Sequence, residues 1–243
     1  MENPKSVALC VTCTVDQLMP EIGVATVKLL RRAGCEVTFP AGQTCCGQPF
    51  FNSGFLAEAR HLAKQTIAAF ADYDAVVLPS GSCTTMIREE YSHLLEDEPD
   101  WQAHALTLAA KTFELSEFLT HQTDWQMPQA ANPRSITYHD SCHMCRLLGL
   151  REEPRQALSA AGCQISEMAE SDRCCGFGGL FSVRMPEVSN AMSGEKLRQA
   201  QETKAPTLVT ADPGCLMQLR GLADEAGPVR LEHLAVVLEE MTR

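Results

Sequence analysis

The segment TCCGQPF (residues 44–50) sets two adjacent cysteines before a glycine, and RCCGFGG (residues 173–179) repeats this arrangement. Glycine permits a tight turn and lets the backbone approach a bulky group closely. Two adjacent thiolates can each hold a different metal atom of one cluster. Both segments therefore predict a metal or redox site.

The rest of the chain repeats around these two segments. Equivalent cysteines keep an offset of 128 to 132 residues, pairing Cys13 with Cys142, Cys35 with Cys163, Cys45 with Cys174, Cys46 with Cys175, and Cys83 with Cys215. Such a register indicates two homologous copies of one structural unit. We expect domains at residues 1–125 and 132–243, with a linker within residues 121–134, a stretch that contains Pro128 and Pro133 and overlaps both domain ends.

Apolar stretches in each half alternate between strand and helix patterns. The predicted strands are residues 6–11, 36–39 and 75–78, then 135–139, 164–168 and 207–210. The predicted helices are residues 20–33, 56–70, 146–161 and 186–204. This alternation predicts an α/β fold of two tandem, pseudo-two-fold-related parallel-sheet units with helices on both faces. The cysteines follow the strands, so we expect their sites at the carboxyl ends of the strands.

Composition narrows the class of protein. The 243 residues are 45% hydrophobic and carry a formal net charge of −11, which predicts no affinity for nucleic acid. The sequence contains no apolar run of the ~20 residues that a membrane span needs, and it opens without a secretory signal pattern. We therefore expect a cytoplasmic protein whose 12 cysteines serve as metal ligands or redox centres and not as disulfides.

Two sets of four cysteines are the candidate metal ligands: Cys13, Cys45, Cys46 and Cys83, and Cys142, Cys174, Cys175 and Cys215. Four cysteines match a [4Fe–4S] cluster, and they match a structural zinc site in ligand number as well. The sets lack the Cys-x2-Cys knuckles of structural zinc, which favours iron–sulfur and leaves zinc possible in one half. Gly47 and Gly176 are the candidate cofactor-binding residues, because glycine would let the backbone come close to a bound cluster.

The other chemically active residues have two interpretations each. Cys10 and Cys145 do not align across the repeat and are either incidental or supplementary ligands, whereas Cys35 and Cys163 are interpreted as small buried hydrophobes. The candidates for proton transfer, substrate binding or hydrogen bonding to cluster sulfur are His139, Asp140, His143 and Asp16. The alternative for these four is a polar capping role in loops. No phosphate-binding or dinucleotide-binding glycine pattern is present.

Five segments resemble the cysteine-rich (CCG) iron–sulfur oxidoreductases: CCGQPFFNSG (45–54), PSGSCTTM (79–86), HDSCHMCRLLG (139–149), CCGFGGLFSV (174–183) and ADPGCLM (211–217). Within that family the chain is most similar to the A subunits of bacterial L-lactate utilisation systems. The resemblance implies that this chain acts together with B and C subunits in the oxidation of L-lactate to pyruvate. It also implies that the chain transfers electrons within that complex and is not active on its own.

A more distant resemblance implies a different activity. The heterodisulfide reductase B subunit ends its motif in Cys-x2-Cys and so has five cysteines per cluster. Here Met86 and Gln218 stand at the fifth position in the two halves. A thiol–disulfide oxidoreductase component is therefore one alternative function, and a zinc-stabilised interaction module without redox activity is another.

Overall fold

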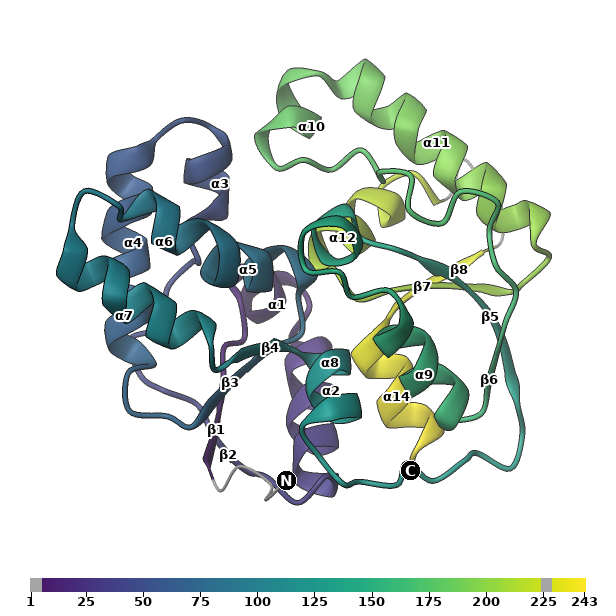
Figure 1. Ribbon diagram of the computed structural model, residues 1–243. Helices are drawn as coiled ribbons and strands as arrows, with labels where there is room; N and C mark the ends of the chain where they lie inside the picture. The colour runs from purple at the N-terminus through teal and green to yellow at the C-terminus, as the bar shows by residue number, and fades with distance from the viewer. Residues whose placement is uncertain (1–5, 224–228) are drawn as a thin grey trace. The chain divides into compact units, whose positions relative to one another are not determined.

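The computed structural model describes residues 6–223 and 229–243. The chain divides into two compact units, Met1–Trp125 and Gln126–Arg243 (Figure 1). Among the helices of the described residues, none combines the length and the apolar character needed to cross a membrane.

The first unit contains a four-stranded parallel sheet. Its strands are β1 (Ser6–Leu9), β2 (Glu36–Thr38), β3 (Ala75–Leu78) and β4 (Thr112–Glu114). Its helices are α1 (Cys13–Leu18), α2 (Pro20–Arg32), α3 (Gln48–Asn52), α4 (Leu56–Ala69), α5 (Gly81–Thr85), the π-helix η1 (Met86–Glu90), α6 (Tyr91–Leu94), α7 (Pro99–Ala109) and α8 (Leu115–His121). The strand order is β2-β1-β3-β4, and every neighbouring pair is parallel.

The second unit repeats this architecture. Its strands are β5 (Arg134–His139), β6 (Cys163–Ile165), β7 (Thr207–Thr210) and β8 (Arg230–His233), in the order β6-β5-β7-β8 and again all parallel. Its helices are the π-helix η2 (His143–Leu147), α9 (Glu152–Ala160), α10 (Leu180–Arg184), α11 (Pro186–Glu202), α12 (Pro213–Arg220) and α14 (Leu234–Met241).

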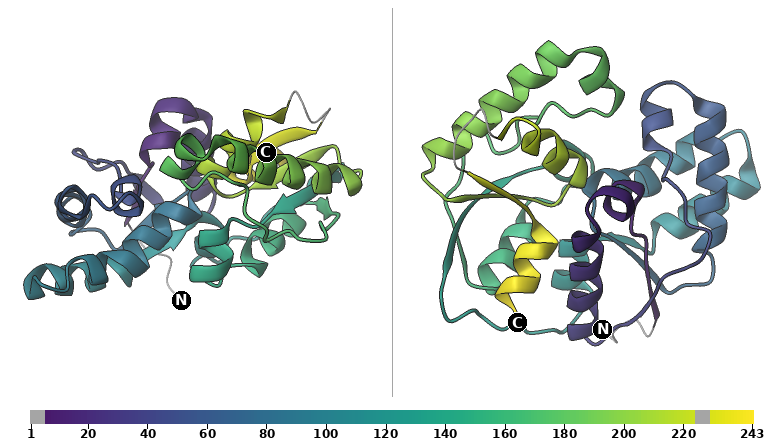
Figure 2. Two further views of the ribbon diagram at one scale, coloured as in Figure 1. Left: turned by 90° about the horizontal axis from the view of Figure 1, so that it is seen from above. Right: turned by 180° about the vertical axis from the view of Figure 1, so that it is seen from behind.

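Helices cover both faces of each sheet, as the sequence predicts. In the first unit α2 and α8 lie on one face while α4 and α7 lie on the other (Figures 1 and 2). In the second unit α9 packs beside α14 on one face, and α11 packs with α12 on the opposite face. Two three-layer α/β units in tandem are therefore confirmed.

The hydrogen-bond register of the strands shows that the two units are equivalent. The β1–β3 pair aligns Ala8 with Val76, and the β5–β7 pair aligns Thr137 with Leu208. These partners are offset by 129 and 132 residues, which are the offsets of the cysteines that follow the same strands. The repeat in the sequence is thus a repeat of backbone geometry.

Helix α2 illustrates how local sequence sets an element. Pro20 stands in its first turn, where the missing N–H is not needed, and Arg31 and Arg32 lie in the last turn, where they oppose the helix dipole. Its apolar residues recur every three or four positions and are buried against the sheet. Gly34 follows with φ 83°, a conformation that ends the helix at low cost.

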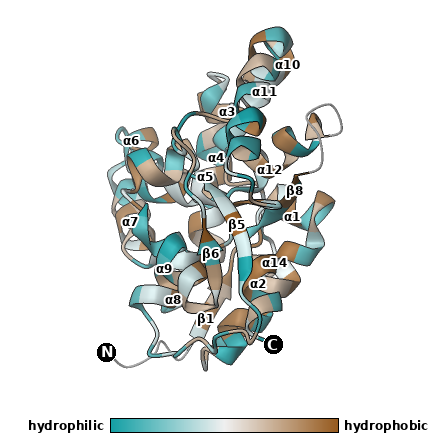
Figure 3. Ribbon diagram, turned by 90° about the vertical axis from the view of Figure 1, so that its right-hand side faces the viewer, coloured by the Kyte–Doolittle hydropathy of each residue, from teal (hydrophilic) through white to brown (hydrophobic). Residues whose placement is uncertain are grey.

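The cores lie between the sheets and their helices. All four residues of β3 and of β7 are buried, because a central parallel strand is covered on both faces. Figure 3 shows hydrophobic residues concentrated along α14, whereas α11 is largely hydrophilic. In the first unit Phe70, Tyr91 and Met86 are essentially inaccessible to solvent and pack in one cluster with Cys46 and Cys83.

Some predicted elements differ from the structure. The edge strands β4 and β8 were not predicted, because each is short and combines apolar with polar residues. The predicted helix at residues 146–161 is wrong in its first part: η2 ends at Leu147, Gly149 adopts φ 71°, and α9 begins at Glu152. The strand predicted at residues 164–168 is the shorter β6, three residues long.

Candidate metal centres

The strand order places the cysteines of the first unit around one point. Strand β1 is followed by Cys13, β3 by Cys83, and the loop after β2 carries Cys45 and Cys46. In the order β2-β1-β3-β4 the chain reverses its winding direction between β1 and β3. Such a switch point leaves a crevice outside the carboxyl ends of the strands, where ligands bind in open α/β sheets.

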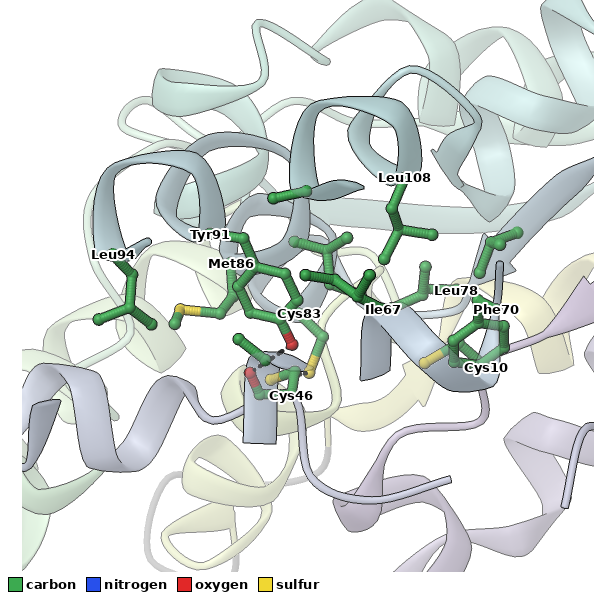
Figure 4. Close-up of a cluster of buried hydrophobic side chains, with 14 of the residues drawn as sticks. Cys10, Cys46, Ile67, Phe70, Leu78, Cys83, Met86, Tyr91, Leu94 and Leu108 are labelled. Carbon is green, nitrogen blue, oxygen red and sulfur yellow. Dashed lines mark hydrogen bonds between the residues drawn. The ribbon is translucent and has the colours of Figure 1, made fainter. Parts of the chain in front are cut away.

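All four cysteines of the first set come together there. The Sγ atoms of Cys13 and Cys45 are 3.6 Å apart, and those of Cys46 and Cys83 are 3.2 Å apart. Figure 4 shows Cys46 and Cys83 pointing toward one another in the core. Cys45 and Cys46 are neighbours in the chain, so the two pairs meet in the loop after β2. Cys46 and Cys83 are buried and Cys13 and Cys45 are half-buried, so the site extends from the core toward solvent.

Side chains that the sequence analysis did not select hold the loops of this site. The Gln43 amide accepts a hydrogen bond from the N–H of Val11 (3.2 Å) and donates one to the carbonyl of Leu9 (2.8 Å). The buried hydroxyl of Tyr91 donates to the carbonyl of Cys46 (2.7 Å). These bonds tie the cysteine pair to the end of β1 and to the core.

The second unit assembles its four cysteines in the same way. The Sγ atoms of Cys175 and Cys215 are 3.0 Å apart, and Cys142 lies near enough to Cys174 for the interaction of the two thiols to raise the pKa of Cys142. The N–H of Gly176 donates to the Sγ atom of Cys174 (3.4 Å). The two sets predicted from the register are therefore each brought together, while their role as metal ligands stays a prediction.

The glycine after each cysteine pair is required by its backbone. Gly47 has φ 87° and Gly176 has φ 91°, a left-handed conformation that L-residues rarely adopt. A Cβ atom on Gly176 would lie 2.5 Å from the carbonyl oxygen of Ser189. The hydroxyl of Ser189 donates to the carbonyl of Gly176 (2.8 Å), and that of Ser193 donates to the carbonyl of Cys175 (2.7 Å). Helix α11 is therefore hydrogen-bonded directly to this loop.

One thiol in each set has a depressed pKa. Hydrogen bonds donated by Cys13 and then by Cys46 lower the pKa of Cys45 to about 3. Those from Cys142 and then from Cys175 lower the pKa of Cys174 to about 2. Each set therefore favours one thiolate supported by neighbouring thiols, and the remaining protons must leave when a metal binds.

His139 lies beside the second set. One of its ring nitrogens and the sulfurs of Cys175 and Cys215 all lie within 4.8 Å of one another, and the three residues are buried. Burial and the positive charge of Lys196 lower the pKa of His139 to about 4, so the imidazole is neutral. Lys196 itself is fully buried on α11 and donates to the carbonyls of Glu170 and Ser171.

Lys196 was missed by the sequence analysis, although a signal exists. Ser189, Ser193 and Lys196 recur at helical spacing on the face of α11 that is buried. A polar stripe on a buried helical face indicates that the face contacts polar groups, here the loop of Cys174 and Cys175.

Asp140 is held in an ion pair. The guanidinium of Arg155 donates to both its carboxylate oxygens (2.8 and 2.9 Å) and also to Glu167. Burial raises the pKa of Asp140, but the hydrogen bonds from Arg155 outweigh it and hold the pKa below its ordinary value. This geometry favours a positioning role, in which Asp140 fixes the chain between His139 and Cys142.

Two further candidates lie at the edges of the sites. The Nδ1 atom of His143 is 3.7 Å from the sulfur of Cys142. Asp16 lines a cleft of about 330 Å³ beside Cys13 and Cys45. The residues that line this cleft include no lysine or arginine, which makes it unsuited to binding a carboxylate on its own.

The four cysteines outside the sets differ in burial. Cys35 and Cys163 are buried at the beginning of the second strand of each sheet, away from both sets. Cys145 is half-buried, with its sulfur 4.0 Å from the carbonyl oxygen of Cys142. Cys10 is buried in the core of the first unit, and burial raises its pKa.

The donor atoms fit a soft metal. Each set offers four thiols, and thiolates select zinc or iron–sulfur clusters over hard cations. The contacting sulfurs, 3.0 to 3.6 Å apart as free thiols, must separate to admit a metal, since a tetrahedral ion with ~2.3 Å bonds holds its sulfurs about 3.8 Å apart. The clustered cysteines indicate metal-binding sites.

Comparison with known proteins agrees with this geometry. The family model of the cysteine-rich domain, CCG, matches residues 7–88 and 136–220, one match in each unit. A crystal structure of a hypothetical protein from Helicobacter pylori superposes with a TM-score of 0.72 at 11% identity, covering 99% of this chain and 49% of that one. The chain spans about half of that protein, and the likeness shows the fold alone.

Full-length relatives define the family more closely. Lactate utilization protein A of Geobacillus thermodenitrificans is 46% identical over 234 residues, covering 96% of this chain and 98% of the relative. Lactate utilization protein A of Bacillus subtilis is 47% identical with the same coverage. The chain belongs to the family of cysteine-rich (CCG) proteins that contains the lactate utilization A proteins.

Proposed function

We propose that the chain is the iron–sulfur subunit of a cytoplasmic complex that oxidises L-lactate to pyruvate. Cys13, Cys45, Cys46 and Cys83 would hold one [4Fe–4S] cluster, and their four counterparts in the second unit would hold another. The observation that carries the proposal is the convergence of each four-cysteine set at the carboxyl ends of its strands, within a family whose relatives are named for lactate utilization.

Bound clusters would supply one-electron transfer. The chain would hold each cluster by one loop and by the starts of the helices that follow the first and third strands, with one side buried and the other half-exposed. The buried cysteines shield the centre from water, and the half-buried Cys13, Cys45, Cys142 and Cys174 face the route by which electrons enter or leave. Electron transfer to a docked partner needs such an exposed edge.

The substrate must be oxidised elsewhere in the complex. Removing two electrons from a 2-hydroxy acid needs a hydride or two-electron acceptor, normally an organic cofactor, whose binding imposes recognisable motifs. The sequence shows none, and the cleft beside Cys13 lacks a cation for the lactate carboxylate. The letter A in the relatives' names supports further components, and we assign the substrate step to B- and C-type partners.

The test is anaerobic reconstitution of the clusters, followed by addition of L-lactate with and without the B- and C-type proteins. We expect reduction of the clusters by EPR, and pyruvate, in the complete mixture alone. Turnover by the isolated chain would show that the substrate site has been misplaced. Failure of the complete mixture with loaded clusters would instead favour the heterodisulfide-reductase-like thiol–disulfide function.

One observation favours a second candidate, a zinc-stabilised module without redox activity. The thiols approach one another more closely than the ligands of a multi-iron centre, and four soft donors suffice for one tetrahedral ion. A colourless protein that carries stoichiometric zinc after anaerobic purification would support this candidate.

A further inference from the structure

His139 and Cys10 occupy the same position in the two units. Each stands three residues before the first cysteine of its set, and they are 129 residues apart. The sheet register agrees, since His139 pairs with Thr210 on β7, and the N–H of Cys10 bonds to the carbonyl of Val77 on β3. The end of the first strand therefore presents an imidazole in one unit and a thiol in the other.

The hydrogen bonds of His139 leave one nitrogen available. Its Nδ1 atom is 3.2 Å from the carbonyl oxygen of Ser171, which can only accept, so the proton is on Nδ1. The same carbonyl accepts from the N–H of Asp140 (3.0 Å) and from Lys196 (3.3 Å), which fixes its position. The Nε2 atom then carries a lone pair, and it is buried without a hydrogen-bond partner.

A buried, unpartnered nitrogen is costly unless something binds it. His139 has two thiols as neighbours, with a ring nitrogen and the sulfurs of Cys175 and Cys215 within 4.8 Å of one another. A ring N–H donated to a backbone carbonyl, with the opposite nitrogen facing other ligands, is the usual arrangement of a metal-bound histidine.

The first unit lacks this arrangement. Cys10 lies in the buried cluster that also contains Cys46 and Cys83 (Figure 4), where a thiol takes the place of the imidazole. Throughout residues 6–223 and 229–243, the group of His139, Cys175 and Cys215 is the one set of three histidine, cysteine or acidic donors within this distance.

We propose that His139, through Nε2, is an additional metal ligand of the second unit, so that this centre has mixed sulfur and nitrogen ligation while the centre of the first unit has sulfur alone. This inference rests on the proposed function for the presence of a metal centre. It supplies, in the second unit, a donor at a different place from the fifth position that Gln218 occupies.

The test uses the full chain labelled with ¹⁵N-histidine, reconstituted anaerobically with iron and sulfide and studied in the reduced state by pulsed EPR. We expect a hyperfine coupling of the size of a directly bound nitrogen in the wild type. The coupling is lost in His139→Gln and retained in the matched control His143→Gln, whose imidazole contacts Cys142. Should His139→Gln fail to fold, His139→Cys replaces it, because the first unit tolerates cysteine at that position.

Two results would overturn the proposal: a loaded wild-type chain without a nitrogen coupling of that size, or a coupling that survives in the His139 variants. A chain that takes up no iron and sulfide would refute the proposed function instead. The labelled chain loaded with ¹¹³Cd²⁺ then tests His139 separately. A ¹¹³Cd–¹⁵N coupling in NMR supports the ligand role, and its absence in a cadmium-loaded chain rejects it.

Discussion

The sulfur atoms of Cys175 and Cys215 lie 3.0 Å apart although 40 residues separate them along the chain. Cys46 and Cys83 form the same contact at 3.2 Å in the first unit. Each pair joins the loop after the second strand of its sheet to the helix after the third. Both pairs are buried, so they form the inner half of each candidate centre.

Removing one sulfur of a four-cysteine set is expected to remove a whole centre. Because serine is a poor substitute for a thiolate ligand, Cys174→Ser or Cys175→Ser should lose about half of the bound metal and all lactate-dependent electron transfer in the complete complex. Cys163→Ala and Cys35→Ala should keep the metal and lower the free energy of unfolding by about 1–2 kcal/mol. Metal analysis of the purified variants measures this, and full activity of a Cys174/Cys175 double variant would contradict a redox role for that unit.

Gly176→Ala should be more damaging than Gly47→Ala. Both positions require a left-handed backbone, which costs an L-residue about 1–2 kcal/mol. The added Cβ at Gly176 would also meet the carbonyl oxygen of Ser189 at 2.5 Å, whereas at Gly47 the nearest atom is 3.4 Å away. Urea unfolding of the two variants compares them, and equal losses of stability would show that the α11 contact does not constrain the loop.

Arg155→Ala should destabilise the second unit strongly. It leaves the carboxylate of Asp140, which is 1% exposed, with only the more distant guanidinium of Arg151 at 3.9 Å, and breaking a buried pair costs about 3–5 kcal/mol. The control is Arg198→Ala, which removes exposed pairs with Glu195 and Glu202 on α11 and should leave the unfolding midpoint nearly unchanged. A similar midpoint in both variants would argue against the structural role of Asp140.

Glu114 should make stability depend on pH. Burial raises its pKa to about 7, against which its hydrogen bonds with Ser116 act only in part. A carboxyl group with a raised folded-state pKa stabilises the fold below its unfolded pKa of ~4.3, and this contribution is lost as the pH rises toward 7. Relative to Glu114→Gln, the wild type should therefore lose stability as the pH rises from ~4.3 to about 7 in urea unfolding. A constant difference across that range would show that Glu114 stays ionised.

Much of the fold follows from sequence because its signals are local or periodic. The four-residue strand β3 was predicted with the bounds the structure shows, since a central parallel strand reads as a short apolar run. The edge strand β8 was not predicted, because Glu232 and His233 interrupt its apolar pattern. His233 also caps α14, since its ring accepts a hydrogen bond from the N–H of Ala235 (3.1 Å). An edge strand such as β8 forms because it pairs with a distant strand of the chain, and a local sequence pattern does not reveal that pairing.

The residues of the candidate sites also fall into those that the sequence predicts and those that it does not. The eight cysteines could be grouped because duplication leaves a constant offset, which a single sequence reveals. Gln43 and Tyr91 could not be selected, because nothing in their neighbours indicates that the fold brings them to the cysteine loops. Lys196 is different, because the polar stripe that it forms with Ser189 and Ser193 on α11 is visible in the sequence. The contrast between Cys10 and His139 required both the strand register and the hydrogen bonds of the imidazole.

The most direct test of the account is the iron, acid-labile sulfide and zinc content of the chain purified without oxygen. Iron and sulfide near four of each per unit, with an EPR signal on reduction, are predicted for the wild type. Cys45→Ser combined with Cys46→Ser should halve both contents by removing the centre of the first unit. Stoichiometric zinc without sulfide in the anaerobic wild type would contradict the central claim that this chain carries electrons.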